Sequence, residues 1–213
     1  TSSFKFHGWF NPTLFKKNLT RFWPIWAVYT AVLAFLLPVE LLLTLTSRSN
    51  LLVNVGNLED VRNIVRVATA AMPTVGFLFG AMAAIALFSY LMNARSVQML
   101  HALPIRREGL FLTNWLSGFA FFLAPNLALL LISALIEAGM GVLDPRGLVL
   151  WLVTATVCPM FFFCFTVCIA MFTGHVLALP VFYGILNVLV IGVCDLMDFA
   201  GGLMLYNYNG NHL

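Results

Sequence analysis

The chain has 213 residues, of which 62% are hydrophobic and 9% are charged, and its mean hydropathy is +0.96. Soluble domains carry about 25% charged residues, so a soluble fold is excluded because it could not bury this much apolar surface. The formal net charge is +3. It gives no reason to expect a nucleic-acid partner, since the basic residues follow the pattern of membrane topology.

Five apolar runs are each long enough to cross a bilayer, which takes about 20 residues per helix. Their uninterrupted length predicts helices, because barrel strands are short and alternate apolar with polar residues. The sequence therefore predicts an all-α, polytopic membrane protein that forms a single transmembrane domain over residues 1–213. The predicted spans cover residues 22–43, 67–92, 110–136, 148–172 and 176–196.

Residues 11–21 predict a separate amphipathic helix before the first span, with Pro12 at a favourable first helical position. Such a helix lies along the membrane interface with its basic face toward anionic headgroups. A simple topological anchor and a contact with a partner protein are both open roles for it. The residues expected to define its two faces are the apolar Leu14 and Phe15 and the basic Lys16, Lys17 and Arg21.

Small residues recur every four positions along the second span, at Gly76, Gly80 and Ala84. This spacing allows a neighbouring helix to approach closely. Packing within one subunit is favoured here over packing between two subunits. Prolines fall in or near the spans at Pro73, Pro125, Pro159 and Pro180 and are expected to bend them, because each frees a backbone carbonyl. A static packing role for these bends is favoured over a hinge role in alternating access.

Basic residues divide unevenly between the two sides of the five spans. One side holds Lys5, Lys16, Lys17, Arg21, Arg95, Arg106 and Arg107, and the other holds Arg48, Arg62, Arg66 and Arg146. The positive-inside rule then places the N-terminus and residues 93–109 in the cytosol, in a plasma (inner) membrane, with the C-terminal end outside. The outer side also carries most of the acids: Glu59, Asp60, Glu137, Asp144, Asp195 and Asp198.

The polar segment 93–109 is predicted to form a short helix, a break and the start of a second helix. Val97, Leu100 and Leu103 fall on one side of its first helix, which ends before Pro104 because proline disfavours a helical residue before it. A short cytosolic helix held beneath two spans suits the transmission of force from a soluble partner. An ordinary basic loop is the alternative.

The run Met99-Leu-His-Ala-Leu-Pro-Ile-Arg-Arg-Glu-Gly-Leu-Phe111 resembles the cytosolic loop of type-2 ABC transporter permeases of the Gram-positive bacterial type, which have an ABCG-like exporter fold. Leu103, Pro104 and Arg107 match the family's Leu-Pro-x-x-Arg-like segment. The resemblance implies that the segment from Arg95 to Ala102 is a coupling helix that docks on an ATPase, and that the helix at 11–21 is the family's connecting helix. The residues expected to couple to the ATPase are Arg95, Val97, Leu100, His101, Leu103, Pro104, Arg106 and Arg107.

The resemblance implies a permease subunit that exports an amphipathic or hydrophobic substrate, such as a peptide, drug or lipid. The chain has no phosphate-binding loop of the Gly-x-x-x-x-Gly-Lys-Ser/Thr type, so separate ABC ATPase subunits would bind ATP and Mg. This chain is expected to bind no cofactor or metal itself, and to pair with a second permease subunit in a homodimer or heterodimer. Family members have six spans, so we expect the native chain to continue into an extracellular segment and a further span; a genuine five-span protein is the alternative.

Two other classes of protein are consistent with a polytopic membrane chain, an intramembrane enzyme and a non-transporting subunit. An intramembrane enzyme is disfavoured, because the spans contain no nucleophile with a base, no HExxH motif and no aspartate pair facing one cavity. A non-transporting membrane subunit for signalling or assembly stays open. Glu40, Asp195 and Asp198 are expected near the outer headgroups, either in contact with water or lining a vestibule for a cationic peptide. The cysteines, Cys164 and Cys168 among them, are expected to act as small buried hydrophobes.

Overall fold

The computed structural model describes residues 12–49, 58–89, 107–173, 175 and 177–210. This part of the chain is helical and contains no strand. Five helical segments are long and apolar enough to cross a membrane, which confirms the predicted all-α, polytopic class. The elements are α1 (Pro12–Arg21), α2 (Trp23–Ala34), the π-helix η1 (Phe35–Val39), α3 (Glu40–Ser49), α4 (Leu58–Ala70), α5 (Met72–Phe88), α7 (Arg107–Gly139), α8 (Pro145–Phe172) and α9 (Ala178–Gly210).

The first span is a continuous rod of α2, η1 and α3 whose buried side chains recur every four residues. These side chains, all at most 3% exposed, are Tyr29, Leu33, Leu37, Leu41 and Leu45. In a regular α-helix of 3.6 residues per turn, a four-residue repeat drifts by about 40° per step. The wider π-turn at η1, which contains Pro38, absorbs part of this drift, so the stripe continues to face the bundle.

The helices extend beyond the predicted spans. The second span was predicted from residue 67, but its helical segment runs from Leu58 to Phe88. The extra turns are amphipathic: Val61 and Val65 are buried, whereas Arg62 is exposed. Apolar run length misses such turns, because only one face of the helix is apolar. The helical spacing of Leu58, Val61, Ile64 and Val65 after Asn57 does predict them. The other four segments extend past the predicted span at one end or both: Trp23–Ser47, Glu108–Gly139, Pro145–Phe172 and Ala178–Gly202.

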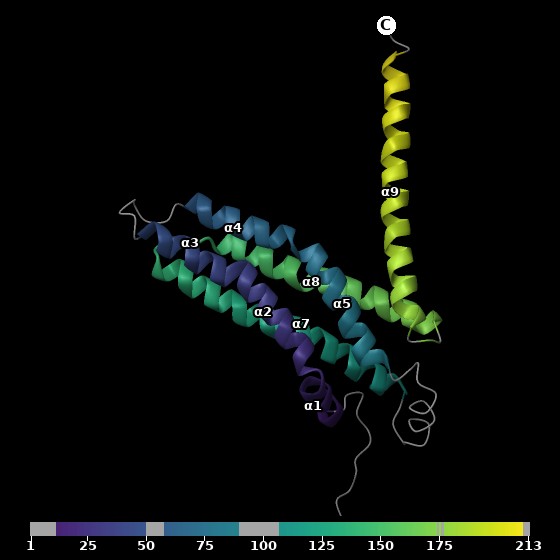
Figure 1. Cartoon of the computed structure of the whole chain (residues 1–213), viewed down its shortest axis with the longest axis horizontal. Helices are drawn as coiled ribbons and strands as arrows, with labels where there is room; N and C mark the ends of the chain where they lie inside the picture. The colour runs from purple at the N-terminus through teal and green to yellow at the C-terminus, as the bar shows by residue number, and fades with distance from the viewer. Residues whose placement is uncertain (1–11, 50–57, 90–106, 174, 176, 211–213) are drawn as a thin grey trace, which may run out of the picture.

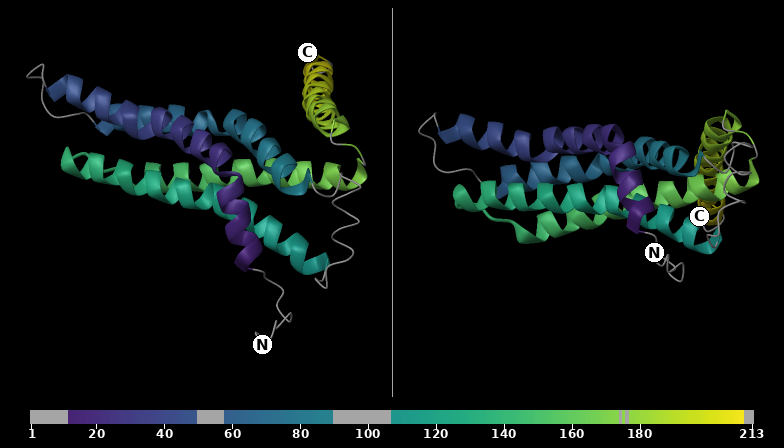
Figure 2. Two further views of the ribbon diagram at one scale, coloured as in Figure 1. Left: turned by 60° about the horizontal axis from the view of Figure 1, so that its bottom comes forward. Right: turned by 90° about the horizontal axis from the view of Figure 1, so that it is seen from below.

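The spans other than α9 lie side by side in one elongated bundle, as Figures 1 and 2 show. We call one end of the bundle the α1 end, where α1 and the start of α7 lie. The opposite end is the α4 end, where α3 ends, α4 begins and residues 140–144 connect α7 to α8.

Helix α9 leaves the bundle at the corner after α8 and projects away from it (Figure 1). Its base is anchored: Leu179 and Tyr183 are buried, and the Tyr183 hydroxyl donates to the carbonyl of Phe77 in α5 at 2.9 Å. Beyond that contact its apolar side chains, for example Val188 and Leu196, are largely exposed. This surface suits lipid, in which exposed leucine and valine cost nothing.

Candidate functional site

Helix α1 is held on α7 by a buried polar contact. Asn18 is the one buried residue of α1, and its Nδ2 donates to Asn114 Oδ1 at 2.6 Å and to Ser117 Oγ at 3.4 Å. Lys16 and Lys17 are exposed, as expected for a basic outer face, and Leu14, Phe15 and Arg21 also lie in this helix. A hydrogen bond shielded from water fixes α1 to one place on α7 more specifically than apolar contact alone.

The predicted coupling segment falls largely outside the described residues. Arg95, Val97, Leu100, His101, Leu103, Pro104 and Arg106 belong to that part, and so does the expected coupling helix; Arg107 is the first residue of α7. The two helices that flank the segment meet directly. The centre of the Phe88 ring, at the end of α5, lies 5.5 Å from the centre of the Phe111 ring, four residues after the start of α7. The ends of α5 and α7 that flank residues 90–106 are therefore in contact with each other.

A polar junction lies in the middle of the bundle, where Pro159 interrupts α8. Because proline has no backbone N–H, the carbonyl of Ala155 loses its helical partner. The side chain of Asn126, on α7, supplies the replacement, with Nδ2 2.9 Å from this carbonyl oxygen. The hydroxyl of Tyr29, on α2, lies 3.0 Å from Asn126 Oδ1 and 3.2 Å from the Ala155 oxygen. Three helices thus meet at one freed carbonyl.

Helices α5 and α8 pack closely at the same level, and the small residues of α5 make this possible. A Cβ on Gly76 would lie 2.9 Å from the Pro159 nitrogen, and one on Gly80 would lie 2.7 Å from the Pro159 oxygen. Ala84, one turn further, is 1% exposed. The glycine spacing therefore serves packing inside one chain.

A charged cluster closes the α4 end, and sequence reasoning assigned it no role. Glu137 is fully buried, and its Oε2 accepts the backbone N–H of Asp144 at 3.0 Å. The Asp144 carboxylate lies 3.3 Å from Nε of Arg62 on α4. Glu137 stabilises the turn between α7 and α8, because it accepts a hydrogen bond from the buried N–H of Asp144, the N-cap residue of α8. The signal in the sequence was an acid at the end of an apolar run, seven residues before a second acid and Pro145.

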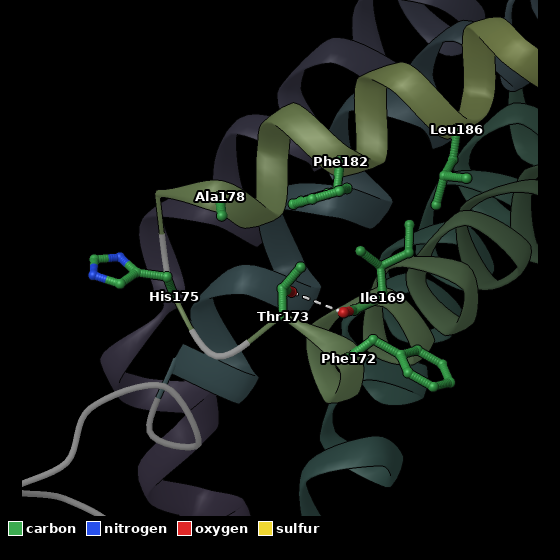
Figure 3. Close-up of a pocket in the computed structure, with 7 residues that line it drawn as sticks. All are labelled: Ile169, Phe172, Thr173, His175, Ala178, Phe182 and Leu186. Atoms are coloured by element: carbon green, nitrogen blue, oxygen red, sulfur yellow. Dashed lines mark hydrogen bonds between the residues drawn. The ribbon is translucent and has the colours of Figure 1, made fainter.

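Two apolar grooves open on the surface of the molecule. One, of about 480 Å³, lies in the corner between α8 and α9 and is drawn in Figure 3. There Phe182 and Leu186 of α9 face Ile169 of α8, whereas the exposed His175 points away from them. The Thr173 hydroxyl donates to the carbonyl of Ile169 at 2.8 Å. The second groove, of about 290 Å³, lies between α1, α2 and α7.

The remaining candidate groups do not gather into a chemical site. In the described ranges no three His, Cys, Asp or Glu side chains are placed to hold a metal ion. Glu40 is exposed at the start of α3, and Asp195 and Asp198 are exposed in α9. The expectation that the cysteines are buried is wrong for two of them. Cys168 and Cys194 are exposed, because they lie on outward faces of their helices.

The fold defines the class of the protein: an all-α membrane protein, with five helices able to span a bilayer in the part of the chain that the structure describes. Comparison with protein-family models, with curated proteins and with solved structures found no match to the chain.

Proposed function

We propose that this chain is the membrane-spanning permease subunit of an ABC exporter, in which separate ATPase subunits bind ATP and Mg and hydrolyse the ATP. The substrate class is amphipathic or hydrophobic: a peptide, a drug or a lipid. The complex contains a second permease subunit, identical or related. In this proposal the α1 end faces the cytosol of a cell with a plasma membrane, and the α4 end faces outside.

One observation carries the proposal beyond the resemblance of residues 99–111. The two segments expected to approach the ATPase converge on the same end of one helix, α7. Residues 93–106 lead into it at Arg107, and α1 is hydrogen-bonded to it at Asn114, about two turns further on. A soluble partner that moved either segment would move α7.

Helix α7 is also suited to carry such a movement across the membrane. It has 33 residues, so it is roughly 50 Å long, which exceeds the bilayer's hydrocarbon core of about 30 Å. At one end it meets α1, in the middle Asn126 bonds to α8 beside Pro159, and at the other end Glu137 fixes the start of α8. Export requires the spans to change from an inward-facing to an outward-facing arrangement. Binding of ATP can drive this change only if it favours the outward-facing arrangement.

The test replaces the predicted contact residues in the intact complex. We expect Leu103→Ala and Arg107→Ala to uncouple ATP hydrolysis from export while leaving thermal unfolding of the complex unchanged. Arg66→Ala, an exposed arginine at the α4 end, is the matched control and should leave coupling intact. Both rates are measured in the same liposomes, with a panel of fluorescent amphipathic peptides, dyes and lipids as reporters.

Unchanged coupling in both variants contradicts the assignment of residues 93–109. Absence of any ATP-dependent export, from a complex that is intact by size, favours the alternative of a non-transporting subunit for signalling or assembly.

A further inference from the structure

The groove between α1, α2 and α7 lies on the outer surface of the bundle and is almost entirely apolar. Its floor on α7 is a row of small side chains spaced four residues apart, which extends over about 12 Å of helix. The residues that matter for its shape are Leu19 of α1, Trp26 and Thr30 of α2, and Ala120, Ala124 and Ala128 of α7.

The polar groups in this groove already have partners within the protein. The indole Nε1 of Trp26 donates to the carbonyl of Leu19 at 3.3 Å, and the Thr30 hydroxyl donates to the carbonyl of Trp26 at 2.6 Å. A guest in the groove therefore gains contact area and no hydrogen bonds, which selects an apolar guest.

Helix α1, which borders the groove, carries two exposed lysines outside the groove's lining. Lys16 lies one turn before Leu19, so the two side chains are neighbours on the helix surface, and Lys17 follows it. Both lysines are exposed, and neither has an ion-pair partner within the described ranges. Helices α1 and α2 contain no acidic residue. On α7 the acid on this side is Glu108, roughly 18 Å of helix rise before Ala120.

We propose that this groove binds one acyl chain of an anionic phospholipid from the surrounding bilayer, with the phosphate of its headgroup at Lys16 and Lys17. The positive charge of α1 complements a phosphate, and the lining of the groove complements a hydrocarbon chain.

The site gives a specific bound lipid a structural role. A chain seated between Leu19, Trp26 and Ala124 fills the angle between α1 and the bundle, next to the Asn18 contact that holds α1 on α7. The lipid would thus stabilise the docked position of α1. This inference needs no ATPase and stands independently of the proposed function.

The test is native mass spectrometry of the full chain in mild detergent, titrated with phosphatidylglycerol and with phosphatidylcholine of the same acyl chains. We expect one phosphatidylglycerol to be retained in preference to phosphatidylcholine. The double substitution Lys16→Gln and Lys17→Gln should weaken phosphatidylglycerol binding by about 10- to 30-fold and leave phosphatidylcholine binding unchanged. Arg66→Gln, which removes an exposed charge at the α4 end, should change neither.

A second variant tests the groove itself. Ala124→Phe fills it and should abolish retention of phosphatidylglycerol. Leu131→Phe, on a side chain of α7 that is 64% exposed, should not. Equal retention of both lipids by the native chain, or phosphatidylglycerol binding that survives the lysine substitutions, overturns the choice of an anionic lipid. Binding that survives Ala124→Phe overturns the assignment of the groove. If Ala124→Phe fails to fold, the lysine variants still decide the headgroup contact.

Discussion

The contact between α5 and α8 makes a quantitative prediction for Gly80→Ala. The added Cβ would lie 2.7 Å from the oxygen of Pro159 and 2.9 Å from both the Cβ of Phe162 and the nitrogen of Phe163, whereas ordinary contact begins at 3.4 Å. These atoms are backbone or adjoin it, so no side-chain rotation relieves the clash and the helices must separate. Overpacking of this kind costs about 1–3 kcal/mol of the free energy of unfolding.

The matched control is Gly184→Ala on α9, where a new Cβ meets nothing within 4 Å. Both substitutions gain up to about 1 kcal/mol from the higher helix propensity of alanine. The difference between the two variants therefore isolates the packing cost.

The assay is reversible unfolding in mixed micelles by titration with SDS, followed by far-ultraviolet circular dichroism. We expect Gly80→Ala to be less stable than Gly184→Ala by about 1–3 kcal/mol, and Gly76→Ala to behave like Gly80→Ala. Equal unfolding free energies for Gly80→Ala and Gly184→Ala would refute the close packing of α5 on α8.

Three further predictions concern the buried polar contacts. Asn126→Ala should lower the unfolding free energy by about 0.6–1.7 kcal/mol. The loss should be smaller in a Pro159→Ala background, because the Ala155 carbonyl there regains its helical partner. A double-mutant cycle that shows no coupling between the two substitutions would reject the Asn126 contact. Asn18→Ala should weaken the docking of α1 on α7 by about 1 kcal/mol, so trypsin should cleave α1 about 5-fold faster. The control Thr20→Ala should leave the cleavage rate unchanged. Glu137→Ala should cost about 1–3 kcal/mol in the same SDS titration, and Glu137→Gln, which keeps an acceptor for the N–H, should cost less; equal losses would argue against that hydrogen bond.

The sequence predicted the five spans because the bilayer imposes one requirement, a long apolar helix, that composition alone reveals. Apolar run length does not extend to the amphipathic turns at Leu58–Arg66, although the helical spacing of their apolar residues predicts them. Nothing in the sequence predicted the π-turn around Pro38. That turn depends on which face of the first span must stay buried, which is known only once its neighbours are placed.

The candidate site was predictable in its separate parts and not in their assembly. A freed carbonyl follows from Pro159 alone, but its partner Asn126 lies 29 residues before Ala155 along the chain and no local pattern joins them. Likewise the amphipathic pattern predicted the helix before the first span. It did not identify Asn18 as the residue that binds α7, because a single asparagine on a helix is ordinarily exposed.

The most direct test of the proposed function is purification of the chain from its native membranes in mild detergent, followed by mass spectrometry of the proteins that accompany it. We predict an ABC ATPase in stoichiometric amount that is lost when the segment from Ala94 to Arg107 is replaced by a flexible linker. A complex that is intact by size and contains no ATPase would contradict the assignment of this chain as an exporter permease.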